Sequence, residues 1–183
     1  MYYDVIIAGF GGQGVILIGN LLAYAGMKMG YNVTFFPSYG VEMRGGTANC
    51  TVVVSDEEIG SPIVGNPKSL IIMNKPSMEK FLPRAEENGL VIYNSTLIDK
   101  DTISRNDVNL IPIPANEMAI ETGNPRLANM IMIGAYIEKT KIVDSDILKN
   151  SLENVISERN LKFIPDNIKA IEKGIEFIKK YQY

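Results

Sequence analysis

The chain opens with a strand, a glycine-rich turn and a helix, and this order constrains its fold more than any other feature. The apolar, β-branched run Tyr3–Ala8 stops at glycines and leads into a proline-free apolar stretch from Gly14 to about Met29. A short apolar run bounded by glycine indicates a buried strand, and the longer stretch after it indicates a helix. This is the first unit of an α/β fold.

Strand and helix patterns continue to alternate along the rest of the chain. Further strands are predicted at Tyr31–Phe36, Thr47–Ser55, Ser69–Met73, Leu90–Tyr93 and Val108–Ile113. Further helices are predicted at Ser77–Glu86, Ala115–Glu121, Leu127–Lys139, from Asp144 or Ser145 to about Ser157, and from an Asp166 cap to Lys180. We therefore expect a single α/β domain over residues 1–183, Rossmann-like and three-layered. Its sheet is mixed but mostly parallel, with helices on both faces and a helical C-terminal end.

Two residue types that carry much of enzyme chemistry are nearly missing from the sequence. There is no histidine, and Cys50 is the only cysteine. Histidine-based nucleophilic catalysis, a cysteine zinc site and a four-cysteine iron–sulfur cluster are therefore excluded within these residues. Cys50 lies in an alternating strand pattern, which favours a small core thiol over a reactive one, and we assign it no function.

Charge and hydropathy argue against nucleic-acid and membrane partners. The formal net charge is −3, no run of basic residues occurs, and no apolar stretch reaches the roughly 18 residues needed to span a bilayer. The N-terminus lacks the basic start of a signal peptide. A cytoplasmic protein is expected.

The glycine turn fits the spacing G-x-G-x-x-G through Gly9, Gly11, Gly12, Gln13 and Gly14. After a strand and before a helix, such a turn can present backbone N–H groups to a phosphate. The second strand ends without the acidic residue that would hold a ribose, so NAD and FAD binding lose support. Two interpretations stay open: the glycines bind an anion, or their role is steric, with Gly9 and Gly11 allowing a sharp turn and Gly14 a close approach of the helix to the sheet. Gln13 suits orienting a ligand or a neighbouring chain.

A second glycine-rich loop, Pro37–Gly46, follows the predicted second strand and carries Tyr39, Glu42, Arg44, Gly45 and Gly46. Ligands and partners of open α/β sheets bind beyond the carboxyl ends of strands. Arg44 has small neighbours, so its guanidinium can pair with a carboxylate or phosphate. The alternative is a solvent-exposed pair between Glu42 and Arg44, which contributes little stability.

Several motifs together resemble the gamma subunits of 2-oxoacid:ferredoxin oxidoreductases. The first three, in chain order, are Gly-x-Gly-Gly-Gln-Gly, Tyr39-Gly-x-Glu-x-Arg-Gly-Gly and Ser55-Asp56-x-x-Ile59-x-Ser61-Pro62. The likeness continues through Ile92-Tyr93-Asn94-Ser95, Ile113-Pro114-Ala115 and Asn124-x-Arg126-x-Ala128-Asn129-Met130. It spans about Asp4 to Gly134, and Val41 stands where the family commonly has proline.

The resemblance implies a subunit rather than a complete enzyme. Such enzymes oxidatively decarboxylate a 2-oxoacid to an acyl-coenzyme A and pass electrons to ferredoxin. It implies that alpha and beta subunits, with a ferredoxin-like delta subunit where present, hold thiamine diphosphate, Mg²⁺ and iron–sulfur clusters, and that coenzyme A is a substrate. No cofactor is expected in this chain, which lacks the Gly-Asp-Gly of a thiamine site. The wording of the motifs is most similar to 2-oxoglutarate enzymes.

We expect the glycine turn, the second loop and Asn129 to face a ligand or an interface, and we expect no catalytic residue and no metal site. Asn129 and Arg126 follow a Gly-Asn-Pro stop and could reach the edge of the glycine turn. Three classes of protein stay open: a non-catalytic oxidoreductase subunit, a stand-alone nucleotide-binding enzyme and a structural interaction domain.

Overall fold

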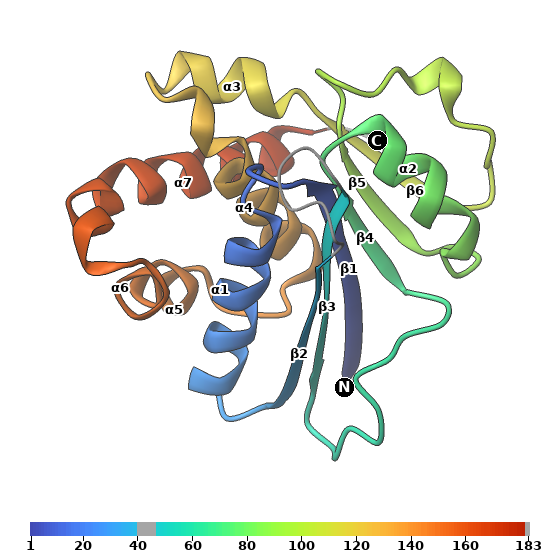
Figure 1. Ribbon diagram of the computed structural model, residues 1–183, viewed down its shortest axis with the longest axis horizontal. Coiled ribbons are helices and arrows are strands. Elements are labelled where there is room, and N and C mark those ends of the chain that lie inside the picture. The colour runs from blue at the N-terminus through green and yellow to red at the C-terminus, as the bar shows by residue number, and fades with distance from the viewer. Residues whose placement is uncertain (40–46, 182–183) are drawn as a thin grey trace.

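Six strands form one sheet in the part of the chain described by a computed structural model, which covers residues 1–39 and 47–181 (Figure 1). The strands are β1 (Tyr2–Phe10), β2 (Asn32–Tyr39), β3 (Thr47–Ser55), β4 (Ser69–Ile72), β5 (Leu90–Asn94) and β6 (Asn109–Ile113). Each lies where the sequence predicts a strand.

The sheet is mixed, with the strand order β2-β3-β1-β4-β5-β6. β1, β4, β5 and β6 run parallel to one another, whereas β3 lies antiparallel between β1 and β2. Because residues 40–46 alone separate β2 from β3, the connection is too short for a parallel crossover, which needs about a dozen residues. The parallel character of the sheet is therefore confined to its β1-to-β6 part.

The helices pack on both faces of the sheet and gather toward the C-terminal end (Figure 1). They are α1 (Val15–Lys28), α2 (Lys75–Phe81), α3 (Ala115–Glu121), α4 (Ala128–Thr140), α5 (Ser145–Asn150), α6 (Leu152–Val155) and α7 (Ile164–Lys180). Short 3₁₀ turns are η1 (Leu82–Arg84), η2 (Lys100–Thr102), η3 (Pro125–Leu127) and η4 (Glu158–Phe163).

Alternation along β1 divides the core into two hydrophobic clusters. Val5 and Ile7 contribute to the larger cluster beneath α1 and α4, while Ile6 and Ala8 contribute to the smaller cluster beneath α2. Successive side chains of a strand point to opposite faces, so a central strand that is apolar on both faces must be covered twice. β1 therefore contributes side chains to the hydrophobic clusters on both faces of the sheet.

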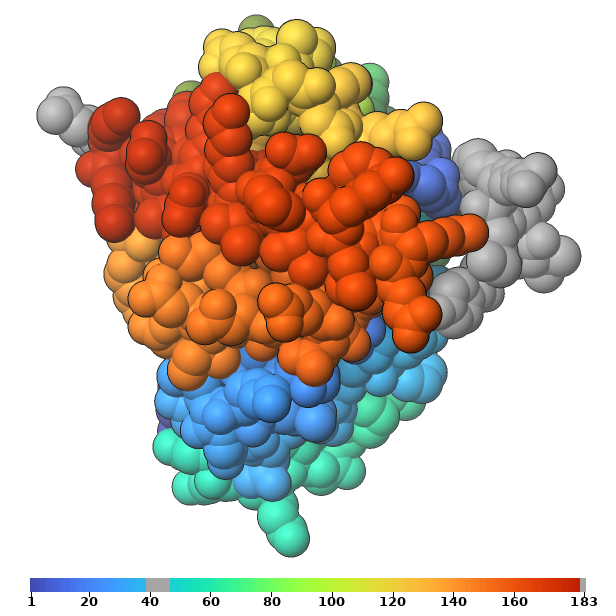
Figure 2. Space-filling model, turned by 90° about the vertical axis from the view of Figure 1, so that its left-hand side faces the viewer, coloured from blue at the N-terminus to red at the C-terminus, as the bar shows by residue number. Residues whose placement is uncertain are grey.

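A further helix layer lies outside α4. From Ala128 to Ile137 every residue of α4 is buried, because α7 packs across the side that faces away from the sheet. Figure 2 shows the C-terminal helices, in orange to red, forming the surface on this side above α1. The two helices cross at glycines: a Cβ on Gly134 would lie 2.2 Å from the carbonyl oxygen of Ile171, and one on Gly174 would lie 2.1 Å from that of Ile131.

Two boundaries before β5 differ from the prediction. β2 continues through Pro37 to Tyr39, into the segment predicted as a loop. Proline is tolerated there because β2 is an edge strand. The helix predicted from Ser77 to Glu86 instead starts at Lys75, because the side chain of Asn74 caps it by accepting the N–H of Ser77 at 2.9 Å. It ends at Phe81, where the 3₁₀ turn η1 follows.

The C-terminal helices also differ from the prediction. Asp144 caps α5 as expected, but the predicted helix is divided into α5 and α6 at Ser151, whose hydroxyl donates to the carbonyl oxygen of Ile147. Asp166 does not cap the last helix. That helix begins at Ile164, because Pro165 already suits the first helical turn, and Asp166 lies within the turn. None of the described helices is long and apolar enough to cross a membrane.

The glycine crossing predicts that Gly134→Ala destabilises the protein. The added methyl group would meet backbone rather than a movable side chain, so α4 and α7 must separate. We expect a loss of about 1–3 kcal/mol of unfolding free energy in urea titration, despite the better helix propensity of alanine. Gly65→Ala is the control, because a Cβ there meets nothing within 4 Å. Equal stability of the two variants would contradict the close crossing.

The buried carboxyl group of Asp4 predicts a pH dependence of stability. Burial raises the pKa of Asp4, and its hydrogen bond from the backbone N–H of Lys68 opposes part of that rise. Its stabilisation is therefore complete below the ordinary pKa of about 4 and is lost as pH rises through the raised pKa. Asp4→Asn keeps an acceptor for Lys68 but does not titrate. Unfolding curves from about pH 4 to about pH 7 should show wild type losing stability relative to this variant.

Candidate functional site

The glycine turn lies at the point where the helices leave the sheet in opposite directions. It joins β1 to α1 on one face, while the neighbouring parallel strand β4 leads into α2 on the other face. Open α/β sheets bind ligands at this kind of topological switch point, beyond the carboxyl ends of the strands. The turn therefore occupies the position in the fold where a ligand or partner is expected.

The four glycines of the turn occupy different structural environments. Gly12 and Gly14 adopt the left-handed conformation, with φ of 99° and 73°, so they make the sharp turn that the sequence assigned to Gly9 and Gly11. A Cβ on Gly9 would lie 2.8 Å from the Cβ of Met73, so this glycine permits close packing of the turn on the end of β4. Gly12 is exposed to open space, and Gly11 is half-buried.

Gln13 is engaged within the fold. Its Oε1 accepts the backbone N–H of Phe10 at 2.7 Å and the side-chain amide of Asn74 at 2.9 Å, and its Nε2 lies 3.5 Å from the carbonyl oxygen of Met73. Asn74 is the cap of α2, so one carboxamide joins the glycine turn to the start of the helix on the other face. Asn74 was not singled out from the sequence, although an asparagine just before a helix start is a recognisable cap signal.

Asn129 comes to the glycine turn from the opposite side. It lies in the first turn of α4, is 4% exposed, and its Nδ2 donates to the carbonyl oxygen of Gly14 at 3.3 Å. A Cβ on Gly14 would lie 2.3 Å from this Nδ2, so Gly14 makes room for α4 rather than for the sheet. The Oδ1 of Asn129 is buried, and it has no hydrogen-bond partner within residues 1–39 and 47–181. Arg126, in η3, is exposed.

The second predicted loop begins and ends beside the glycine turn. Tyr39 pairs with Ala48, which pairs in turn with Gly9, and Thr47 pairs with Phe10. Residues Glu42, Arg44, Gly45 and Gly46 lie outside the described part of the chain, as does the side chain of Tyr39. The ends of the loop therefore lie at the carboxyl edge of the sheet, where the sequence predicts the loop.

The described side chains around the turn are suited to hydrogen bonding rather than to proton transfer. Gln13, Asn74 and Asn129 are neutral carboxamides, which donate and accept hydrogen bonds without titrating. Within residues 1–39 and 47–181, no group of three or more acidic or cysteine side chains is placed to hold a metal ion. Cys50 lies beneath α1, where burial raises the pKa of its thiol to about 12 and its Sγ contacts the carbonyl oxygen of Val15.

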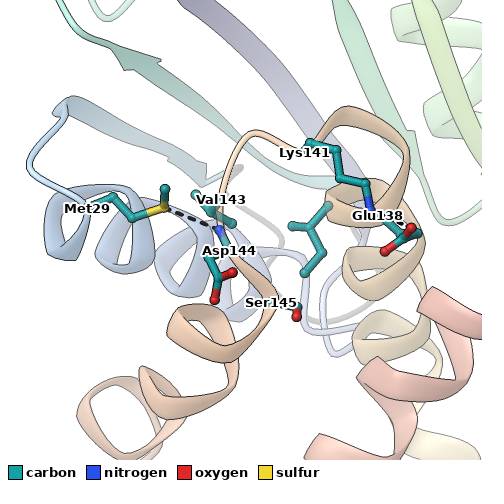
Figure 3. A pocket seen from close by; sticks show the side chains of 7 residues that line it. Met29, Glu138, Lys141, Val143, Asp144 and Ser145 are labelled. Atoms are coloured by element: carbon teal, nitrogen blue, oxygen red, sulfur yellow. Dashed lines mark hydrogen bonds and ion pairs between the residues drawn. The ribbon is translucent and has the colours of Figure 1, made fainter.

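One cavity lies far from this edge, near the C-terminal ends of α1 and α4 (Figure 3). Its volume is about 330 Å³, and it is lined by Met29, Ile137, Glu138, Lys141, Val143, Asp144 and Ser145. Its charged groups are engaged: Lys141 pairs with Glu138, Asp144 accepts two N–H groups of α5, and the N–H of Asp144 donates to the sulfur of Met29. The charged lining groups of this cavity are thus bound to one another or to the backbone.

Curated proteins similar to this chain include oxidoreductase subunits named for different 2-oxoacids. The chain is 36% identical over 177 residues to the ketoisovalerate oxidoreductase subunit VorA of Methanothermobacter marburgensis, an alignment that covers 96% of this chain and 36% of VorA. It is 33% identical over 183 residues to the 2-oxoglutarate synthase subunit KorC of Methanocaldococcus jannaschii, covering 98% of this chain and 96% of KorC. The chain thus spans about a third of the VorA relative and nearly all of KorC.

A solved structure has the same fold. The keto/oxoacid ferredoxin oxidoreductase gamma subunit from Geobacter sulfurreducens superposes with a TM-score of 0.83 at 23% sequence identity, covering 96% of this chain and 95% of that one. The mixed α/β sheet with a helical C-terminal end is therefore an architecture that gamma subunits share. The family model for pyruvate ferredoxin/flavodoxin oxidoreductase matches residues 4–177. The chain belongs to the pyruvate ferredoxin/flavodoxin oxidoreductase family.

Proposed function

We propose that the chain acts as the gamma subunit of a 2-oxoacid:ferredoxin oxidoreductase that converts 2-oxoglutarate and coenzyme A to succinyl-coenzyme A, carbon dioxide and reduced ferredoxin. The observation that carries the proposal is the full-length match to KorC, named as a subunit of 2-oxoglutarate synthase. The slightly higher identity to VorA supports a second candidate substrate, ketoisovalerate. Pyruvate is the third 2-oxoacid to test, because the family is named for it.

The residues of this chain do not fit the cofactors of such an enzyme. A four-cysteine cluster cannot be built from Cys50 alone, and the sequence has no Gly-Asp-Gly for magnesium pyrophosphate. We therefore assign thiamine diphosphate, Mg²⁺ and the iron–sulfur clusters to alpha and beta subunits, with a ferredoxin-like delta subunit where the complex has one. Ferredoxin meets the complex through those chains, in the cytoplasm.

The role of this chain is then to bind and position a companion chain or coenzyme A. The glycine turn, the two ends of the second loop and Asn129 lie at one edge of the sheet, and the described part of that edge offers neutral hydrogen-bonding groups. The buried Oδ1 of Asn129 needs a donor, because an unsatisfied buried acceptor costs about 1–3 kcal/mol. A companion chain or coenzyme A at this edge would meet the exposed turn at Gly12 and the ends of the second loop.

We predict that the isolated chain folds without a cofactor and oxidises no 2-oxoacid, and that activity appears only with its companion subunits. Turnover would be followed with a ferredoxin substitute on 2-oxoglutarate, pyruvate and ketoisovalerate. The 2-oxoglutarate kcat/KM should be the highest of the three, while native mass spectrometry gives the composition of the complex. Activity of the isolated chain, or a nucleotide bound to it in stoichiometric amount, would support a stand-alone enzyme instead. A ketoisovalerate preference would support the second candidate.

Arg44 provides a second test, because we expect it to face the companion subunits or the path of coenzyme A. Truncating one partner of a buried charge pair costs about 2–5 kcal/mol, whereas an exposed pair contributes about 0–1 kcal/mol. Arg44→Ala should therefore weaken assembly, or raise the apparent KM for coenzyme A, by more than about tenfold. Arg159→Ala, at an exposed position in η4, is the control. Turnover of the Arg44 variant within about twofold of wild type at all coenzyme A concentrations would make this loop a bystander.

A further inference from the structure

The connection between β3 and β4, residues Asp56–Lys68, forms a prominent loop at the end of the molecule opposite to the glycine turn. It contains no helix or strand, and Figure 1 shows it projecting below the start of β1. Loops of about a dozen residues without secondary structure are uncommon in compact domains, where they often carry function. We refer to this segment as the β3–β4 loop.

The β3–β4 loop is held in one shape by contacts from outside it. Arg84 donates from Nη2 to the carbonyl oxygen of Val64 at 2.8 Å and from Nε to that of Gly65 at 3.2 Å. At the far end of the loop, Asp4 accepts the N–H of Lys68 at 2.7 Å. These contacts fix the second half of the loop, which reduces the ordering that binding through it would have to supply.

The tip of the loop presents an apolar side chain to solvent. Ile63 is 73% exposed, the highest value among the large hydrophobic residues exposed in the described part of the chain. Its neighbour Val64 is buried, and the hydroxyl of Ser61 accepts the N–H of Ile63 at 3.1 Å. Val64 is therefore buried, whereas Ile63, the residue before it, faces solvent. An isoleucine held in this way can enter a pocket on another surface.

The first half of the loop is acidic and borders a groove. Asp56, Glu57 and Glu58 are all exposed; Asp56 pairs with the N-terminal ammonium group, and no ion pair to Glu57 or Glu58 is found within residues 1–39 and 47–181. Glu58, Ile59 and Gly60 face Asn32, Val33 and Thr34 of β2 across a cavity of about 490 Å³.

The nearby cations are already engaged. Lys68 places its Nζ over the ring of Tyr2, 4.9 Å from the centroid, and Arg84 is bound to the carbonyl groups of the loop. Neither cation is paired with Glu57 or Glu58 in the described part of the chain, so two unpaired acidic side chains precede the apolar tip of the loop. A complementary surface has an apolar pocket with lysine or arginine at its rim, because rim charges of opposite sign favour association and register.

We propose that the β3–β4 loop is a docking element of this chain, with Ile63 as its anchor in an apolar pocket of a companion subunit and Glu57 and Glu58 meeting basic residues around that pocket. The proposal rests on the proposed function to the extent that a companion subunit exists. It places a second contact at the end of the molecule opposite to the glycine turn.

The test measures binding of the full chain to the purified companion subunits of the same complex, by biolayer interferometry at several salt concentrations. Ile63→Ser should raise the dissociation constant at least tenfold. Leu161→Ser, which also removes an exposed apolar side chain but from η4, should stay within twofold of wild type. Glu57→Gln with Glu58→Gln should weaken binding at low salt and reduce its salt dependence. All variants change exposed residues, so circular dichroism and melting should match wild type.

The outcomes separate this proposal from the proposed function. If Ile63→Ser binds within twofold of wild type, or if Leu161→Ser weakens binding equally, the docking role of the loop is overturned while the complex stands. If wild type binds its companions as described but the complex oxidises no 2-oxoacid, the proposed function fails and the docking element remains. Failure of wild type to bind the companions would overturn both.

Discussion

The carboxamide of Gln13 is the interaction on which the arrangement of the glycine edge depends. It accepts hydrogen bonds from Phe10 at the end of β1 and from Asn74 at the start of α2, so it joins elements that leave the sheet toward opposite faces. A side chain with a single carbonyl oxygen and no charge can satisfy both donors without a counter-ion. Asn74 in turn fixes where α2 begins. The switch point of the sheet is thus set by two neighbouring amides.

Neutral groups at this edge are consistent with a chain that positions rather than catalyses. Histidine is absent from the sequence, and Cys50 is buried with a raised thiol pKa, so neither supplies a nucleophile or base. What the edge offers is shape and hydrogen bonding: two glycines in left-handed conformation, a packed amide from α4 and the ends of a second loop. Such a surface can complete a site whose reactive groups belong to other chains.

The two ends of the parallel strands are built differently. At the carboxyl end, glycines and amides pack closely, and the described residues provide no hydrogen-bond partner for the buried Oδ1 of Asn129. At the amino end, a loop anchored by Arg84 holds Ile63 in solvent beside acidic side chains. The helices between them are joined by the glycine crossing of α4 and α7, which adds a layer to that side of the fold. Contacts at both ends would hold a subunit in a defined orientation.

Much of the fold follows from the sequence because periodicity is a local property. The apolar runs predict all six strands, and the motif order predicts the family. The sequence also locates the glycine turn, since a strand and a helix flank it. Asp144 is recognisable as a cap because the hydrogen bonds that it accepts are only two and three residues away.

Other features were decided by tertiary contacts that no local pattern records. The short connection of residues 40–46 makes β3 antiparallel to β2, but it does not decide that β3 also pairs with β1, and β2 extends through Pro37 because an edge strand can spare one donor. Gly14 and Asn129 are 115 residues apart, yet one makes room for the other. The sequence by itself determined the elements, the family and the absence of histidine and cysteine chemistry. Only the tertiary structure decided that Gln13 is engaged within the fold and that Ile63 faces solvent, because burial and hydrogen-bond partners depend on segments distant in sequence.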